Sequence, residues 1–124
     1  MTKKLRITLY FISAYLALFG VLFLLAPSVA ERITHTTHDA TLNVLYGQYT
    51  MTFAFVAFMA ARKREATSEL SLVVLVLTAG HVIVFSYLFM SGIQDFSQAG
   101  APLIVNSILA VLLFLFRKTA EHAS

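Results

Sequence analysis

His81 is the residue of this chain best suited to carry chemistry inside a membrane. It is the only histidine within the long apolar runs of the sequence, where polar side chains are costly and commonly mark functional sites. An imidazole there can relay protons, hydrogen-bond a ligand or bind a metal. The alternative is a structural histidine, bonded to a hydroxyl or carbonyl of a neighbouring helix. Helical spacing predicts Thr78 and Phe85 on the same face as His81.

A second set of polar side chains gathers toward one end of the apolar runs. Its members are Tyr46, Gln48 and Tyr49 in the second run, Tyr87 in the third and Asn106 in the fourth. All fall at a similar depth, so we expect them to meet beside His81. They either form hydrogen bonds between helices or line a small-molecule or lipid pocket.

Metal-binding residue types occur in the polar stretch between the first two runs, where a short helix is expected. On a helix, His35, His38 and Asp39 share one face at i, i+3 and i+4 spacing. Two imidazoles and a carboxylate can bind zinc or another divalent ion. The alternative is a solvated loop in which Asp39 or Thr41 caps the next helix.

Other common chemistries find no support in the sequence. There are no cysteines, which removes thiolate zinc sites and iron–sulfur ligation. The sequence also lacks a nucleophile–base constellation, a phosphate-binding loop and a dinucleotide fingerprint. We therefore expect no cofactor, and a binding or accessory role rather than an enzymatic one.

Four long apolar runs must position these residues. They cover 7–26, 42–61, 70–90 and 102–116. About 20 apolar residues cross ~30 Å of hydrocarbon as an α-helix, and 59% of the 124 residues are hydrophobic. Four helices with short connections use the whole chain. The sequence predicts one all-α transmembrane domain, 1–124, built as an integral membrane four-helix bundle.

Basic residues indicate the orientation of this bundle. Three precede the first run, three lie between the second and third, and two follow the fourth, so that eight of the nine fall on one side. Only Arg32 lies on the other side. The positive-inside rule places the eight, and both termini, in the cytoplasm of a multi-pass inner-membrane protein. The +3 net charge follows from this topology, so we expect contact with membrane lipids and no nucleic-acid partner.

The first run has a second interpretation. Lys3 and Lys4, an apolar run and then Ser28-Val29-Ala30 imitate a secretory signal with its cleavage site. The apolar part of such a signal usually has about 7–15 residues, and the run 7–26 is longer. We expect the first helix to be retained, whereas cleavage would leave three spans.

Several short strings are shared with a known group of proteins. They are Gly20 with Leu24-Leu25-Ala26-Pro27, Leu45-Tyr46-Gly47, Ala79-Gly80-His81, Ser91-Gly92 and the apolar run after Pro102. In this order they resemble a poorly characterised family of small four-helix bacterial inner-membrane proteins, in the neighbourhood of the DoxX-like proteins. The resemblance implies the four-helix fold and no established activity.

The sequence leaves three functions open. A hydrophobic bundle without a catalytic set favours a non-enzymatic accessory or interaction subunit, or a small-molecule or lipid binder with an outward-facing polar pocket. One alternative is a channel or transporter lined by Gln48, His81 and Asn106. Because four helices enclose little space, it requires a homo-oligomer or a larger membrane complex. The other is a membrane enzyme acting on a lipid or quinone, with His81 as acid–base.

Overall fold

The computed structural model of the chain describes residues 2–35, 40–63 and 69–123, and these residues form five helices and no strand. In chain order the helices are α1 (Thr2–Leu25), α2 (Pro27–Thr34), α3 (Ala40–Arg62), α4 (Glu69–Met90) and α5 (Phe96–Ala123). The prediction of an all-α fold is confirmed. The short α2 lies in the polar stretch where a short helix was predicted.

Four of the helices are long and apolar enough to cross a membrane. The candidate spans are Lys3–Leu25, Thr41–Arg62, Glu69–Met90 and Phe96–Lys118. Each contains almost all of one predicted apolar run. The helices also continue into charged residues at their ends, because lysine, arginine and glutamate are good helix formers.

The start of α5 differs from the prediction. The sequence predicts a span that opens at Pro102, whereas the helix begins at Phe96 and contains the proline. The reason is a capping box. Asp95 Oδ1 accepts the backbone N–H of Gln98 at 3.1 Å, and Gln98 Oε1 accepts the backbone N–H of Asp95 at 3.2 Å. These reciprocal bonds start the helix one residue after Asp95.

Two local backbone features set the turns at the ends of α1 and α4. A proline disfavours the helical conformation of the residue before it. Ala26, which precedes Pro27, accordingly has a non-helical φ of −139° and ψ of 62°, so the chain bends between α1 and α2. Gly92 follows α4 with φ +78°, a left-handed conformation that glycine adopts at no steric cost. Both turns return the chain toward the bundle.

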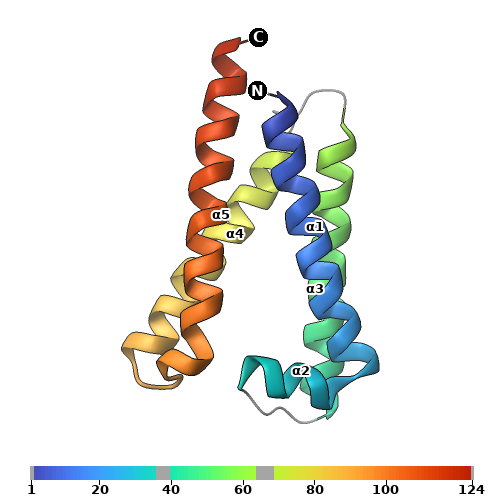
Figure 1. Ribbon diagram of the computed structural model, residues 1–124, viewed down its shortest axis with the longest axis vertical. Coiled ribbons are helices and arrows are strands. Elements are labelled where there is room, and N and C mark those ends of the chain that lie inside the picture. The colour runs from blue at the N-terminus through green and yellow to red at the C-terminus, as the bar shows by residue number, and fades with distance from the viewer. Residues whose placement is uncertain (1, 36–39, 64–68, 124) are drawn as a thin grey trace.

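The long helices form two hairpins (Figure 1). In one, α1 packs along α3; in the other, α4 packs along α5. Both termini lie at one end of the molecule, called here the terminal end, and α2 lies at the other, the α2 end. Figure 1 shows the two hairpins close together at the terminal end and spread apart at the α2 end.

Buried side chains explain this shape, because the apolar core occupies the terminal half. Its members are Leu5, Leu9, Ile12, Phe53, Ala57, Ala60, Ala61, Val74, Leu109 and Leu113. Alanines on α3 let neighbouring helices approach. Ser13 Oγ also donates to the carbonyl of Ala54 at 2.8 Å, which joins α1 to α3. The hairpins therefore meet around this core and separate beyond it.

Candidate functional site

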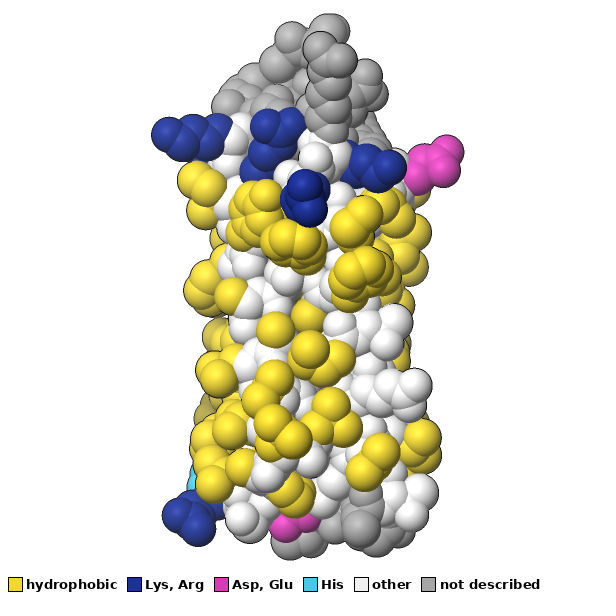
Figure 2. Space-filling view, turned by 90° about the vertical axis from the view of Figure 1, so that its right-hand side faces the viewer, with side chains coloured by type: hydrophobic (Ala, Val, Ile, Leu, Met, Phe, Trp, Pro, Cys, Tyr) yellow, Lys and Arg dark blue, Asp and Glu magenta, His cyan; other side chains and the backbone are white. Residues whose placement is uncertain are grey.

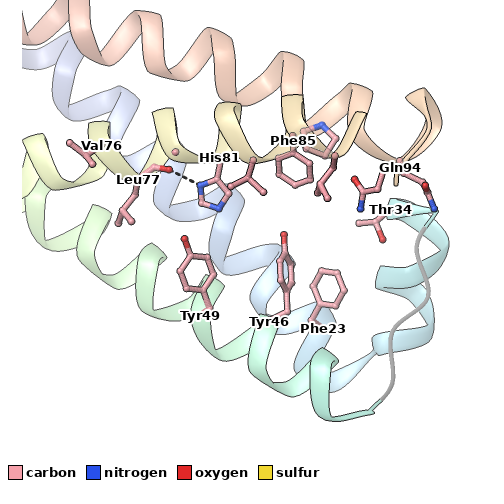
Figure 3. A pocket seen from close by; sticks show the side chains of 14 residues that line it. Phe23, Thr34, Tyr46, Tyr49, Val76, Leu77, His81, Phe85 and Gln94 are labelled. Carbon is pink, nitrogen blue, oxygen red and sulfur yellow. Dashed lines mark hydrogen bonds between the residues drawn. The ribbon is translucent and has the colours of Figure 1, made fainter. Parts of the chain in front are cut away.

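A cavity of about 680 Å³ lies between the hairpins, in the half of the molecule nearer the α2 end. Tyr46 and Tyr49 of α3 form one wall, and His81 and Phe85 of α4 form the opposite wall (Figure 3). Its volume falls within the ~300–1,000 Å³ of small-molecule sites. Aromatic and aliphatic side chains provide most of the lining, and none of the described lining residues is an aspartate, glutamate, lysine or arginine.

His81 marks the boundary between the packed core and the cavity. Its ring projects from α4 toward the tyrosines of α3 (Figure 3). The ring stacks on the core residue Phe53, with centroids 5.6 Å apart and planes 8° from parallel. Phe85 stacks at 6.4 Å and 20°, and Tyr49 lies at 5.9 Å in a tilted arrangement. These rings hold the imidazole in place and direct its edge into the cavity.

A backbone hydrogen bond defines the tautomer of His81. Nδ1 lies 2.8 Å from the carbonyl oxygen of Leu77, one turn earlier on α4. A carbonyl only accepts, so Nδ1 carries the proton. In the neutral ring Nε2 is then an acceptor. The expected structural alternative was a bond to a neighbouring helix, and the structure instead places the partner on the same helix.

Polar groups close the cavity at the α2 end. Gln98 Nε2 donates to the carbonyl of His35 at 2.8 Å and thereby joins α5 to the end of α2. Thr34 and Gln94 lie beside this contact in the lining. Gln94 Oε1 is buried and accepts no hydrogen bond from the described part of the chain. The cavity thus has acceptors at both ends, His81 Nε2 and Gln94 Oε1.

A smaller cavity of about 120 Å³ adjoins the first. It shares Tyr46, His81 and Phe85 with the larger cavity and reaches Tyr15 on α1 and Asn106 on α5. The imidazole therefore borders both spaces. Together they extend from the seam between α3 and α4 into the middle of the bundle.

The structure brings together only some of the predicted site residues. His81, Tyr46 and Tyr49 line the large cavity, and Asn106 lines the small one. Thr78, Gln48 and Tyr87 line neither. Thr78 is only 1% exposed, within the helix packing, and donates to the carbonyl of Val74 at 2.7 Å. Gln48 is exposed on α3, and Tyr87 is 64% exposed on α4.

The predicted metal residues are described only in part. His35 follows α2 with a left-handed φ of 55°, and its carbonyl accepts the bond from Gln98. His38 and Asp39 lie outside the described residues. Within the described ranges, the structure has no group of three or more histidine, aspartate or glutamate side chains placed to hold a metal ion. The three-residue metal site stays a prediction.

Sequence reasoning missed three residues that line the cavity, Gln94, Gln98 and Gly80. Gln94 and Gln98 were overlooked because the fourth span was expected to open at Pro102; the signal was the Asp95-x-x-Gln98 capping box. Phe53 lies in the buried core outside the cavity lining and stacks on His81. At Gly80 a Cβ atom would meet nothing within 4 Å, because this residue of α4 faces the cavity.

One ionisable group near this end lies outside the spans and has a shifted pKa. Asp95 is exposed, and the hydroxyl of Ser97, 2.5 Å from Oδ1, is the main cause that lowers the pKa of its carboxyl group. The backbone N–H of Gln98 acts in the same direction. Asp95 is therefore charged at neutral pH, where it favours the start of α5.

Comparison with family models, with curated proteins and with solved structures finds no match to this chain. The resemblance to the DoxX-like neighbourhood stays a prediction. Function has to be inferred from the cavity and from its place in the bundle.

Proposed function

We propose that this chain is a bacterial inner-membrane protein that binds a small amphipathic molecule in the cavity between α3 and α4. Both termini lie in the cytoplasm, and the cavity lies in the outer half of the bilayer. The role is binding, because the lining offers one imidazole and two tyrosines without a nucleophile–base pair among the described residues. The protein acts as a lipid or small-molecule binder within the membrane, alone or as a subunit.

The observation that carries the proposal is the cavity itself. Stable helix pairs in membranes are closely packed, and α1 and α3 follow this rule over their length. Between α3 and α4 close packing gives way to a cavity of about 680 Å³, which His81 lines. The lining residues Val76 and Val84 are 62% and 53% exposed, so the cavity reaches the surface that lipid would cover. A membrane-dissolved ligand can enter from the side.

The charge distribution supports the orientation. Lys3, Lys4, Arg6, Arg62, Lys63, Arg117 and Lys118 occur near the terminal end, and Arg32 is near the α2 end. Figure 2 shows basic side chains gathered at the terminal end above a broad hydrophobic surface. The positive-inside rule makes the terminal end cytoplasmic. The α2 end and the cavity then face outward.

A cavity-filling variant tests the binding function. Leucine at Gly80 would project into open space, because a Cβ atom there meets nothing within 4 Å. Val73→Leu is the matched control, since Val73 is on the same helix, is 44% exposed and lies outside the cavity lining. Native mass spectrometry of protein purified in mild detergent should show a bound molecule on wild type and V73L that G80L loses. Equal occupancy of G80L, or no adduct on wild type, would contradict the proposal.

Single cysteines test the orientation, because the chain has none of its own. Ser28→Cys on α2 and Lys63→Cys at the terminal end both place a thiol at exposed positions. A membrane-impermeant maleimide added to intact spheroplasts should label S28C and leave K63C unlabelled until the membrane is opened. The reverse pattern would invert the topology.

A further inference from the structure

The hydrogen-bonding capacity of the cavity points to the chemical class of its ligand. We propose that the ligand is a neutral, phenol-type compound, a hydroxyl on a flat apolar ring, whose O–H donates to His81 Nε2. This inference rests on the proposed binding function and makes it more specific.

The requirement for a donor follows from the bond between His81 and Leu77. Since the Leu77 carbonyl takes the Nδ1 proton, Nε2 presents a lone pair. No hydrogen bond from the described residues reaches Nε2, and the ring edge faces the cavity (Figure 3). A ligand hydroxyl satisfies this acceptor, whereas an ether or ester oxygen leaves it unpaired. Gln94 Oε1 adds a second acceptor at the other end, which suits a ligand with a further donor.

The requirement for neutrality follows from the lining. Among the described residues, no aspartate, glutamate, lysine or arginine lines either cavity. An ion moved from water into this part of the bilayer would lose hydration without gaining a counter-charge, which is costly. Fatty acids and phosphate esters are therefore disfavoured in the inner part of the cavity, beside His81.

The preference for a flat ring follows from the walls. Tyr49, His81 and Phe85 present ring surfaces to the same space, and Phe23 and Tyr46 pack edge-to-face at 4.7 Å beside them. Aromatic rings pair well with further rings in stacked or edge-on geometry. A planar ligand can join this arrangement, while a flexible alkyl chain loses rotational freedom without those contacts.

A matched pair of probes isolates the hydroxyl. 4-Dodecylphenol and 4-dodecylanisole share the ring and the chain, and the anisole lacks only the O–H donor. Binding is measured by native mass spectrometry titration on protein in nanodiscs of fixed lipid composition. We expect the phenol to bind wild type up to about tenfold more tightly than the anisole, a factor that corresponds to ~1.4 kcal/mol.

Two variants separate this inference from the proposed function. His81→Phe keeps a ring to stack between Phe53 and Phe85 and removes Nε2, so it should equalise the two probes. G80L should weaken both probes together, with V73L as the unchanged control. If both probes bind wild type equally well and G80L loses both, the requirement for a ligand hydroxyl is overturned, while the cavity stands as a binding site. Binding that G80L leaves intact would overturn the site. A monodisperse elution profile for H81F excludes misfolding as the cause of its effect.

Discussion

Two glycines in the bundle should respond in opposite ways to the same added methyl group. Gly47 of α3 faces α1, where a Cβ atom would lie 2.7 Å from Leu24 Cγ and 3.2 Å from the carbonyl oxygen of Gly20. Gly80 of α4 faces the cavity, where a Cβ atom meets nothing within 4 Å. Gly47→Ala and Gly80→Ala are therefore a matched pair with the same chemistry and different surroundings.

The expected magnitudes follow from these distances. Alanine favours a helix over glycine by about 0.5–1 kcal/mol, and both variants receive this gain. Overpacking a closely packed interface costs about 1–3 kcal/mol, and only Gly47→Ala incurs it, because neither the branched Cγ of Leu24 nor a backbone oxygen can move freely. We expect Gly80→Ala to stabilise by up to about 1 kcal/mol and Gly47→Ala to destabilise by about 1–2 kcal/mol.

The assay is reversible unfolding in mixed micelles of a mild detergent and increasing SDS, followed by circular dichroism at 222 nm. The free energies of unfolding of the two variants should differ by about 2 kcal/mol, with wild type between them. If Gly47→Ala is as stable as wild type, α1 and α3 do not approach as closely as the structure shows. If Gly80→Ala is destabilised as strongly as Gly47→Ala, the space beside Gly80 is filled by protein and the cavity is not real.

Three further substitutions test the capping box, the contact that closes the cavity and the link between α1 and α3. Because Ser97 lowers the pKa of Asp95 below its usual 3.8, this carboxylate stabilises the fold above that pH and ceases to do so as pH falls through its folded pKa. Asp95→Asn keeps a capping oxygen but cannot titrate, so its melting temperature should fall less than that of wild type between pH 6 and pH 3. An equal fall in both proteins would show that the charged Asp95 does not stabilise the start of α5. Gln98→Glu can still accept from the backbone of Asp95 but cannot donate to the carbonyl of His35, so hydrogen exchange should speed up in α2 and stay unchanged in the core half of α1; equal protection of α2 would show that Gln98 does not hold it. Ser13→Ala removes the 2.8 Å bond to Ala54 and should cost only about 0.6 kcal/mol by SDS unfolding, the average for such bonds in membranes. A loss of several kcal/mol would mean that Ser13 has further partners.

The four long helices were predictable because a single physical quantity determines them. A bilayer demands about 20 apolar residues per crossing, and the chain supplies four such runs between polar ends. The boundary at Phe96 was harder to predict. Pro102 is common at the first turn of a helix and suggested a start there, while the stronger signal, the reciprocal pairing of Asp95 and Gln98, occupies four residues of a polar connection.

Which face of each helix points inward could not be predicted. The runs are apolar on all sides, so periodicity gives no direction. Tyr46 and Tyr87 looked equivalent in the sequence, both tyrosines at a similar depth. Tyr46 lines the cavity, whereas Tyr87 is 64% exposed on α4 and lines neither cavity. The two tyrosines differ because α3 and α4 are rotated differently about their own axes. The packing around Phe53 in the terminal half fixes these rotations.

The polar residues themselves explain why a cavity persists. Thr50, Thr78, Asn106 and His81 each bond to the carbonyl four residues earlier on their own helix. The donors of these side chains are thus satisfied within their own helices and do not draw α3 and α4 together.

At the α2 end the hydrogen bond from Gln98 to the His35 carbonyl still joins the two hairpins, and the apolar core that would otherwise hold them lies at the opposite end. A ligand of the proposed kind, held between the α3 and α4 walls of the cavity, would supply contacts between the hairpins in this half of the molecule. Such a ligand would raise the free energy of unfolding by about 2.7 kcal/mol when its free concentration is a hundred times its dissociation constant. That is comparable with the cost of overpacking at Gly47. Ligand binding and the closeness of the two hairpins are therefore coupled, so a bound ligand would stabilise the whole bundle and not only the site.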